Sequence, residues 1–234
     1  SAERGLDLAT VDAGSLTVRE LNRRLKDMAA EGAEITVTNP GARHNTGVGI
    51  FHPCKINIEG SVGYYSASMM DGPEITIHGN AGWALGENMM SGKIVLTKDA
   101  GASVASTIRG GEIFVGGNAG ARAGISMKGG ALIVKGNSGF LTGFMMQKGR
   151  IIVCGDAGEA VGDSMYEGEI YVAGSVGSLG NDAVVEDASE DQLLDVWATL
   201  ERYGVAERPT FTKIVSGKKL YHMDSLERLE KAAI

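Results

Sequence analysis

The chain has 234 residues, enough for a sizeable hydrophobic core and compatible with a single domain. Its 35 glycines are about twice the usual share, yet they follow no three-residue period, which excludes collagen, and an apolar fraction of 43% excludes a disordered chain. The net charge of −7 argues against nucleic acid as a partner, and because no run of about 18 apolar residues occurs, no membrane span is predicted.

The first part of the chain predicts one helix. Residues 1–16 are mixed in composition, and we expect a surface lead-in there. Thr17 and Glu20 form a capping-box pattern, so a helix should begin after Thr17. Its apolar residues recur at helical spacing and should pack against the rest of the protein: Val18, Leu21, Leu25 and Met28. Gly32 is suited to end this helix.

A short strand is predicted next. Residues 34–38 alternate between polar and apolar side chains, which is typical of a strand with one buried face. An Asn-Pro-Gly sequence at 39–41 breaks the strand, and a loop over 44–49 leads onward. We expect the strand to cap the open end of the structure that follows, because an unpaired sheet edge invites aggregation.

The stretch from Lys55 to about Gly177 is an internal repeat of seven copies with a period of 19 residues. The copies begin at Lys55, Glu74, Lys93, Glu112, Ala131, Arg150 and Glu169. One place later each copy has an aliphatic residue: Ile56, Ile75, Ile94, Ile113, Leu132, Ile151 and Ile170. Eight places after its start each copy has a glycine: Gly63, Gly82, Gly101, Gly120, Gly139, Gly158 and Gly177. A large apolar residue recurs near the end of the copies: Met70, Met89, Ile108, Met127, Met146 and Met165.

This period predicts a β-solenoid with one strand per coil. Apolar residues two apart give each short strand one inward face, and the glycines let the chain bend sharply or approach its neighbour closely. Nineteen residues are too few for a strand–helix–strand crossover of about thirty residues. Stacked coils would bury each aliphatic column against its own copies, and the methionine column should fill corners of this core rather than line a cofactor groove.

Polar and glycine positions in the turns are expected to set the turn chemistry. A short polar residue lies between the glycines, suited to local bonds from side chain to backbone: Ser61, Asn80, Asp99, Asn118, Asn137, Asp156 and Ser175. Lys98 interrupts a second glycine column. Ala67 and Ala105 stand where other copies have Gly86, Gly124, Gly143 and Gly162. We interpret these departures as changes in turns that leave the fold intact.

After Gly177 the period fails, and a tail with two helices is predicted. Ser189 and Gln192 form a second capping-box pattern. The helix that follows carries Leu193, Val196, Trp197 and Leu200 on one face and would stop at Gly204. An extended stretch from Pro209 through residues 214–215 should follow, and then a last helix from Asp224. We expect these helices to cover one side or end of the solenoid, or to dock a partner.

The repeat therefore divides the chain into three segments. Residues 1–54 would form the N-terminal helix, strand and cap, residues 55–182 the β-helix, and residues 183–234 a helical tail.

The column formed by the middle residue of each strand is apolar where a solvent-facing column would be polar. The middle residue of each strand should face outward, yet in the last five coils it is apolar. These residues form what we call the apolar stripe: Val95, Phe114, Ile133, Ile152 and Tyr171. A stripe of this kind must be covered, either by the chain's own helices or by a partner subunit.

The sequence predicts no catalytic, cofactor-binding or metal-binding residue. A P-loop needs four residues between its glycine and Gly-Lys-Ser/Thr, whereas Gly86 is one residue too far from Gly92-Lys93 and Ile94 replaces the hydroxyl. A dinucleotide glycine motif needs a long helix, which a 19-residue coil cannot hold.

Metal and thiol chemistry are equally disfavoured by the spacing of the ligand types. His44 and His52 lie eight residues apart, and the remaining histidines, His78 and His222, are isolated. Cys54 has no histidine at a repeat-neighbour position that would make it a nucleophile. It lies about five coils from Cys154, so a disulfide is not expected. Unpaired cysteines, together with the lack of a signal-peptide pattern, predict a cytoplasmic protein.

Several blocks of the repeat resemble a known family. The blocks at 79–82, 117–120 and 155–158, which read Gly-Asn/Asp-Ala-Gly, resemble the GXGXG domain of glutamate synthases. Three others, at 63–65, 87–92 and 124–129, are similar to stand-alone members of the family, the middle subunits of N-methylglutamate synthases (methylamine–glutamate N-methyltransferases). The resemblance covers about residues 16–185 and implies a right-handed parallel β-helix.

The resemblance also implies a role. The chain would be a non-catalytic scaffold subunit of a hetero-oligomeric enzyme, with an amidotransferase-like subunit and a subunit carrying FMN and an iron–sulfur cluster as partners. Neither cofactor would bind to this chain, and the complex would make N-methylglutamate from methylamine and glutamate. The alternatives are a subunit of an archaeal or bacterial glutamate synthase proper, and a free-standing β-solenoid binding module or polysaccharide-active enzyme.

An enzyme acting on the coil surface would need paired carboxylates. The outward acids Glu59, Glu74, Glu112 and Glu169 occupy different strand positions or lie two or more coils apart, too far for an acid and base pair. The scaffold interpretation is therefore favoured.

Overall fold

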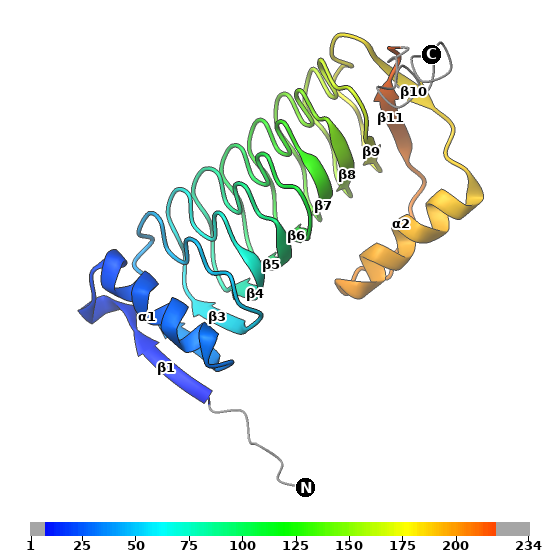
Figure 1. The fold of residues 1–234 in the computed structure, drawn as a ribbon. Helices are drawn as coiled ribbons and strands as arrows, with labels where there is room; N and C mark the ends of the chain where they lie inside the picture. Colours follow the sequence, from blue (N-terminus) through cyan, green and yellow to red (C-terminus); the bar gives the residue numbers. More distant parts are fainter. Residues whose placement is uncertain (1–7, 219–234) are drawn as a thin grey trace, which may run out of the picture.

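The structure, a computed structural model, describes residues 8–218 of the chain. This part winds into a parallel β-solenoid of about seven turns, confirming the predicted fold class (Figure 1). One side of the solenoid is a ladder of short strands, and the rest of each coil is turns. The predicted helix from Asp224 lies outside the described residues.

Eleven strands of the described chain form one sheet in the order β1-β2-β3-β4-β5-β6-β7-β8-β9-β11-β10. The parallel ladder comprises β1 (Leu8–Asp12), β2 (Glu34–Thr38), β3 (Lys55–Glu59), β4 (Asp71–Ile77), β5 (Ser91–Leu96), β6 (Glu112–Val115), β7 (Lys128–Val134), β8 (Lys148–Val153) and β9 (Glu169–Val172). From β3 onward, residues 19 apart pair directly, as Ile56 with Ile75 does. The sequence period is therefore the register of the sheet.

The N-terminal end differs from the prediction in two respects. The lead-in contains β1, which pairs in parallel with β2. As a result β2 lies between β1 and β3 and is an ordinary rung of the ladder, so the prediction that it caps the end is wrong. β1 was missed because it is an added edge strand outside the repeat, with no 19-residue copy to reveal it.

The interior of the solenoid is filled by the predicted aliphatic columns. Both inward positions of every repeat strand are buried, and so are all six members of the methionine column. Met70 and its copies thus belong to the hydrophobic core, as predicted. Stacking like on like lets each coil bury its side chains against the coils on both sides.

The glycine column acts through close approach and not through a left-handed backbone. A Cβ on Gly120 would lie 2.9 Å from the backbone nitrogen of Ala102 and the backbone carbon of Gly101. Left-handed residues occupy other columns of the coil, and in one of them Gly86 has φ +73° while Ala67 and Ala105 have φ +51° and +60°. The two alanines therefore adopt the turn conformation that glycine adopts in other copies, as expected for a local change in turn chemistry.

The polar column in the turns joins coils instead of making local bonds. From Ser61 through Asp156, each side-chain oxygen accepts the backbone N–H of the equivalent residue in the next coil, at distances of 2.7–3.0 Å. The prediction of local turn bonds was wrong because a side chain that projects along the stack finds a neighbouring turn at the strand spacing of about 4.8 Å.

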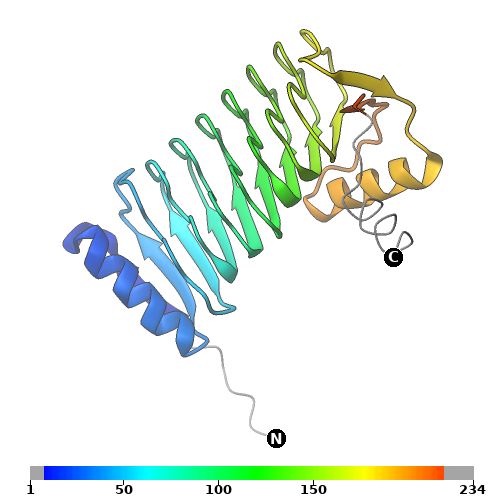
Figure 2. The same cartoon turned by 45° about the horizontal axis from the view of Figure 1, so that its top comes forward.

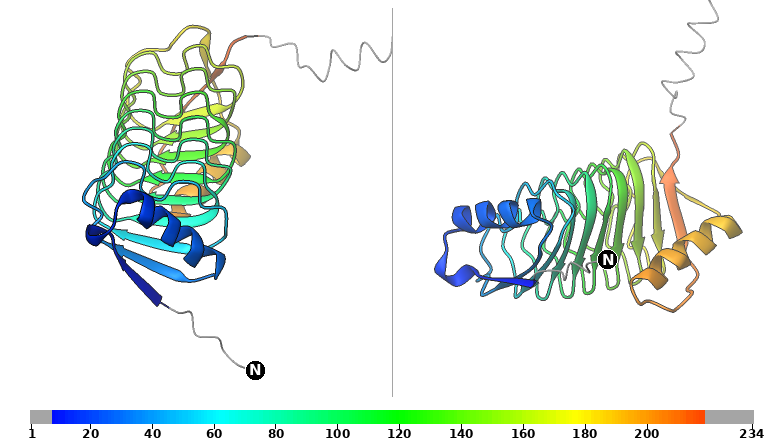
Figure 3. Two further views of the ribbon diagram at one scale, coloured as in Figure 1. Left: turned by 60° about the vertical axis from the view of Figure 1, so that its left-hand side comes forward. Right: turned by 60° about the horizontal axis from the view of Figure 1, so that its bottom comes forward.

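Helix α1 (Val18–Ala30) covers the N-terminal end of the core (Figure 3). The hydroxyl of Thr17 caps it by accepting the N–H of Glu20 at 3.2 Å, and Gly32 follows its end at φ +75°. Leu21, Leu25 and Ala29 are buried in the solenoid core. The helix therefore packs as its apolar face predicts. A short 3-10 helix, η1 (Ala13–Ser15), connects β1 to it.

The C-terminal end is closed mainly by strands. The tail contains β10 (Ala183–Glu186), α2 (Glu190–Arg202) and β11 (Thr212–Ser216). β11 pairs antiparallel with β9, and β10 pairs antiparallel with β11, so the open edge of the last coil gains backbone partners. Helix α2, with the predicted capping box at Ser189, runs along the side of the last strands (Figure 2).

Candidate functional site beneath helix α2

The apolar stripe is covered by the chain's own helix. Phe114, Ile133, Ile152 and Tyr171 are buried, and they form a second hydrophobic cluster, separate from the solenoid core, with residues of α2 and the segment after it. The members of this cluster from the C-terminal segment are Val196, Leu200 and Val205, with Trp197, Tyr203 and Phe211 packed against them. The sequence left two possibilities for covering the apolar stripe, the chain's own helices or a partner subunit. The structure shows that the chain's own helix covers it.

Aromatic rings fix the position of α2 over the strands. The ring of Phe114 stacks on Tyr203, with centroids 4.7 Å apart, and Tyr171 meets Phe211 edge-on at 6.0 Å. The indole N–H of Trp197 donates to the carbonyl oxygen of Pro209 at 3.0 Å. These contacts hold α2 and the segment after it against the strands.

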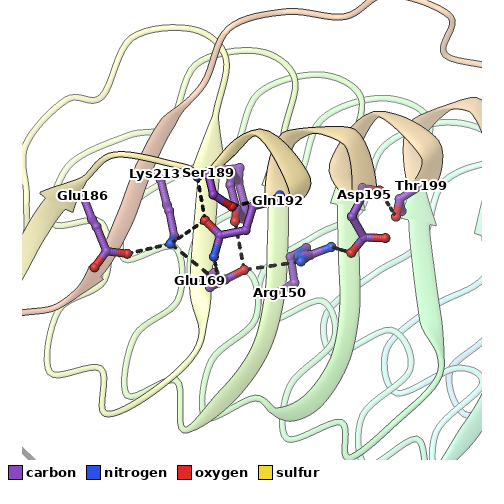
Figure 4. Close-up of polar contacts among 9 residues, drawn as sticks. Arg150, Glu169, Glu186, Ser189, Gln192, Asp195, Thr199 and Lys213 are labelled. Atoms are coloured by element: carbon purple, nitrogen blue, oxygen red, sulfur yellow. Dashed lines mark hydrogen bonds and ion pairs between the residues drawn. The ribbon is translucent and has the colours of Figure 1, made fainter.

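A polar cluster joins α2 to the last strands (Figure 4). Lys213 on β11 is only 4% exposed, and its ammonium lies 2.6 Å from Glu186 and 3.7 Å from Glu169. The side chain of Gln192 on α2 accepts from Lys213 at 3.1 Å and donates to Glu169 at 3.2 Å. Tyr171 donates its hydroxyl to the same carboxylate at 2.9 Å. A buried cation is thus surrounded by acceptors, as burial of a charge requires.

Two further contacts extend this cluster along the helix. Arg150 on β8 pairs with Asp195 of α2 at 2.6 Å and with Glu169 at 3.4 Å. Near the other end of α2, Glu112 pairs with Arg202 at 2.6 Å and accepts the hydroxyl of Tyr203. A hollow of about 380 Å³ between these contacts is lined by charged groups that already have partners.

The ionisable groups under α2 are held in their neutral or paired forms. Burial raises the pKa of Tyr171 and Tyr203 well above the usual tyrosine range, and the hydrogen bonds to Glu169 and Glu112 act in the same direction. Burial likewise raises the pKa of the Cys154 thiol to about 11, with Glu207 adding to the effect and Lys135 opposing it. At neutral pH these groups therefore act as donors or as an inert thiol.

The four outward acids named from the sequence lie in different surroundings. Of the four outward acids, Glu112 and Glu169 each accept a tyrosine hydroxyl and pair with a cation from the tail or a neighbouring coil. The other two, Glu59 and Glu74, are exposed on β3 and β4. The structure therefore brings the acids to separate structural contacts and does not assemble an acid and base pair.

The histidines and cysteines are the remaining candidates for metal and thiol chemistry. Among residues 8–218 no three His, Cys, Asp or Glu side chains come together as metal ligands. His44 stacks on Tyr64 with centroids 4.2 Å apart and accepts the N–H of that residue at 2.8 Å. Cys54 and Cys154 are free, in agreement with the sequence analysis, and His222 lies outside the described residues. No helix in the described range is both long and apolar enough to cross a membrane.

One exposed feature was missed from the sequence. His44, Tyr64 and Trp83 stack in successive coils, and the centroids of Tyr64 and Trp83 are 4.8 Å apart. The signal was present as aromatic residues at spacings of 20 and 19. This pattern is a weak signal because Ala102 and Ala121 interrupt the column before Phe140, whereas the core columns run through all seven copies.

Comparison with known proteins places the fold in a family. The molecule is a parallel β-solenoid of coils joined by glycine turns, and the family model described as the GXGXG motif matches residues 15–195. The chain therefore belongs to the GXGXG motif family. A curated relative, Protein GlxC of Rhizobium meliloti (strain 1021), is 41% identical over 71 residues. This similarity covers 30% of the chain and 31% of the relative, so the match spans less than a third of either protein.

Proposed function

We propose that the chain is a scaffold subunit of a glutamate-synthase-like enzyme complex, most closely of the N-methylglutamate synthase type. It would hold an amidotransferase-like subunit and a subunit carrying FMN and an iron–sulfur cluster in a fixed relation, without supplying catalytic residues or binding either cofactor. The observation that carries the proposal is the membership of residues 15–195 in the GXGXG motif family.

The geometry supports a structural role. The core columns are continuous from end to end, both ends are closed by secondary structure, and the outward acids Glu112 and Glu169 are engaged in fastening the tail. A rod of stacked coils whose own ends are covered resists further growth and keeps surfaces on its sides at fixed distances. Such a rod is suited to position other subunits.

The proposal of methylamine and glutamate as substrates rests on three short blocks of sequence. The blocks at 63–65, 87–92 and 124–129 are the part of the resemblance that favours stand-alone subunits of the N-methylglutamate synthase type. Two free cysteines are in keeping with a cytoplasmic complex, which is the location we propose.

Co-expression tests the proposal. The tagged chain is expressed with candidate amidotransferase-like and flavin-containing proteins from the same organism, and the purified material is assayed for FMN, iron and product. We expect a stoichiometric complex that forms N-methylglutamate from methylamine and glutamate. Glutamine-dependent formation of glutamate would instead favour a glutamate synthase proper. A chain that purifies without either protein and binds an oligosaccharide would favour the free-standing binding module.

A further inference from the structure

The first coils of the solenoid carry an uncovered ladder of aromatic rings. His44, Tyr64 and Trp83 stack on one another, and Tyr64 and Trp83 are 37% and 55% exposed. Backbone bonds hold the ladder in register, since Asn45 donates its N–H to the carbonyl oxygen of Tyr64 and Tyr65 donates to that of Trp83. Exposed tryptophan and tyrosine on a rigid backbone are the side chains most enriched at interface hot spots.

The ladder stops with one ring face open. In the next two coils the equivalent positions are Ala102 and Ala121, so among residues 8–218 no further ring stacks on the far face of Trp83. A hollow of about 280 Å³ lies there, with Arg122 and Glu87 among its lining residues. Within residues 8–218 neither of these two charges has an ion-pair partner. The hollow could thus receive an apolar side chain against Trp83, with polar groups around it.

A basic groove lies along helix α1. Arg19, Arg23 and Lys26 line a hollow of about 530 Å³ between the helix and the loop of the first coil. All three side chains are exposed, and none has an ion-pair partner in the described part of the chain. They form a stripe because residues four and then three apart share one helical face.

The groove and the ladder are contiguous. Asn45 lines the groove and directly follows His44, the first ring of the ladder. The side chain of Asn22 on α1 donates to the carbonyl oxygen of Asn45 and accepts the N–H of Gly47, both at 2.7 Å. These bonds fix the helix against the coil that begins the ladder. The cations of α1 and the rings of the ladder are therefore held in a fixed relation.

We propose that this surface, made of Arg19, Arg23, Lys26, His44, Tyr64 and Trp83, docks a partner subunit of the complex through an acidic segment. Carboxylates of the partner would enter the groove on α1, and an apolar or aromatic side chain beside them would stack on the open face of Trp83. The inference rests on the proposed function and adds where the partner binds and which chemistry it presents.

Charge complementarity favours an acidic segment of a partner subunit as the ligand of this surface. Carboxylates are the natural counterpart of three unpaired cations, and charged rims mainly increase the association rate while a central aromatic residue holds the complex together. A second copy of the chain is disfavoured because two molecules of net charge −7 repel each other, and nucleic acid is disfavoured by the same net charge.

Matched variants test the surface. The affinity of the full chain for the purified amidotransferase-like and flavin-containing subunits is measured at low and high salt. The double variant Arg19→Glu/Arg23→Glu reverses the charge of the groove, and its control is Arg24→Glu, an exposed cation of α1 outside the groove. Trp83→Ala removes the last ring, and its control is Phe140→Ala, which is 49% exposed in the same column three coils away.

We expect Arg19→Glu/Arg23→Glu and Trp83→Ala each to weaken binding of one partner subunit by about tenfold or more, with both controls within about twofold of wild type. Salt should weaken the wild type more than the double variant, because fewer charge pairs remain to be screened. Melting temperatures confirm that each variant is folded. If Trp83→Ala proves unstable, the binding of the Arg19→Glu/Arg23→Glu variant alone tests the docking surface.

The remaining outcomes overturn the inference. If wild type binds both subunits and the double variant binds them equally well, the partner docks elsewhere while the scaffold function stands. If wild type binds neither subunit, both proposals fail. If the double variant abolishes self-association or binding to a DNA duplex that the wild type shows, the surface serves a second copy or nucleic acid instead.

Discussion

Replacing Phe114 by Asp should detach helix α2 from the solenoid. Phe114 is 7% exposed, and its ring is stacked between the strand face and Tyr203. The new carboxylate would lie on the same strand as Glu112, whose own carboxylate accepts the hydroxyl of Tyr203. The substitution therefore removes a buried ring and places a second negative charge beside an existing one.

The expected cost follows from these contacts. Truncating a buried phenylalanine costs about 3–5 kcal/mol, and an unpaired charge left in a desolvated contact costs a similar amount. The two terms do not add fully, because α2 can leave its place while the solenoid core, a separate cluster, stays packed. We expect α2 to lose at least about 3 kcal/mol of local stability.

Hydrogen exchange over residues 190–202 is the assay, supported by thermal melts of the isolated chain. The control is Phe140→Asp, because Phe140 is 49% exposed and its substitution should change stability by no more than about 0.5 kcal/mol. Faster exchange confined to α2 and its contacts is the expected result. Unchanged exchange and melting in Phe114→Asp would refute the assignment of α2 as the cover of the apolar stripe.

Three other predictions concern the turns, the buried thiol and cofactors. Gly120→Val should destabilise the chain by about 3 kcal/mol or more, because its Cβ would lie 2.9 Å from backbone atoms of the preceding coil, and an unchanged melting temperature would contradict this. Burial raises the pKa of the Cys154 thiol from its usual value of 9.0 to about 11, so the folded chain favours the neutral thiol over the thiolate. The contribution of this group to the free energy of unfolding is therefore complete below pH 9.0 and is lost as the pH rises from there through about 11. Urea titrations should show the free energy of unfolding falling over that interval and falling less steeply in Cys154→Ala. The chain purified alone should be colourless, and a stoichiometric flavin spectrum would contradict its place as a cofactor-free subunit.

The repeat is the part of the molecule that sequence reasoning predicts best. A period of 19 residues fixes which side chains stack, so the inward columns, the methionine column and the apolar stripe follow directly from counting. The capping-box patterns at Thr17 and Ser189 locate the starts of α1 and α2. Both hydrogen bonds of the box form at Ser189, whereas at Thr17 only the hydroxyl accepts a backbone N–H, that of Glu20.

What sequence reasoning misses depends on pairing between distant or unrepeated segments. β1 and β10 have no copy elsewhere in the chain, and β11 joins the ladder antiparallel to β9, which no period can show. The bonds of the polar column run from coil to coil, so a reading of each turn by itself assigns them wrongly. The cluster around Lys213 likewise draws on four elements that meet only in the folded chain.

Assembly with and without this chain tests the scaffold function most directly. The amidotransferase-like and flavin-containing subunits are mixed in equal amounts, with the chain present or omitted, and their masses are measured by native mass spectrometry. The scaffold function predicts one complex containing all three proteins, which separates into its parts when the chain is left out. A complex of the other two proteins that forms equally well without the chain would contradict it.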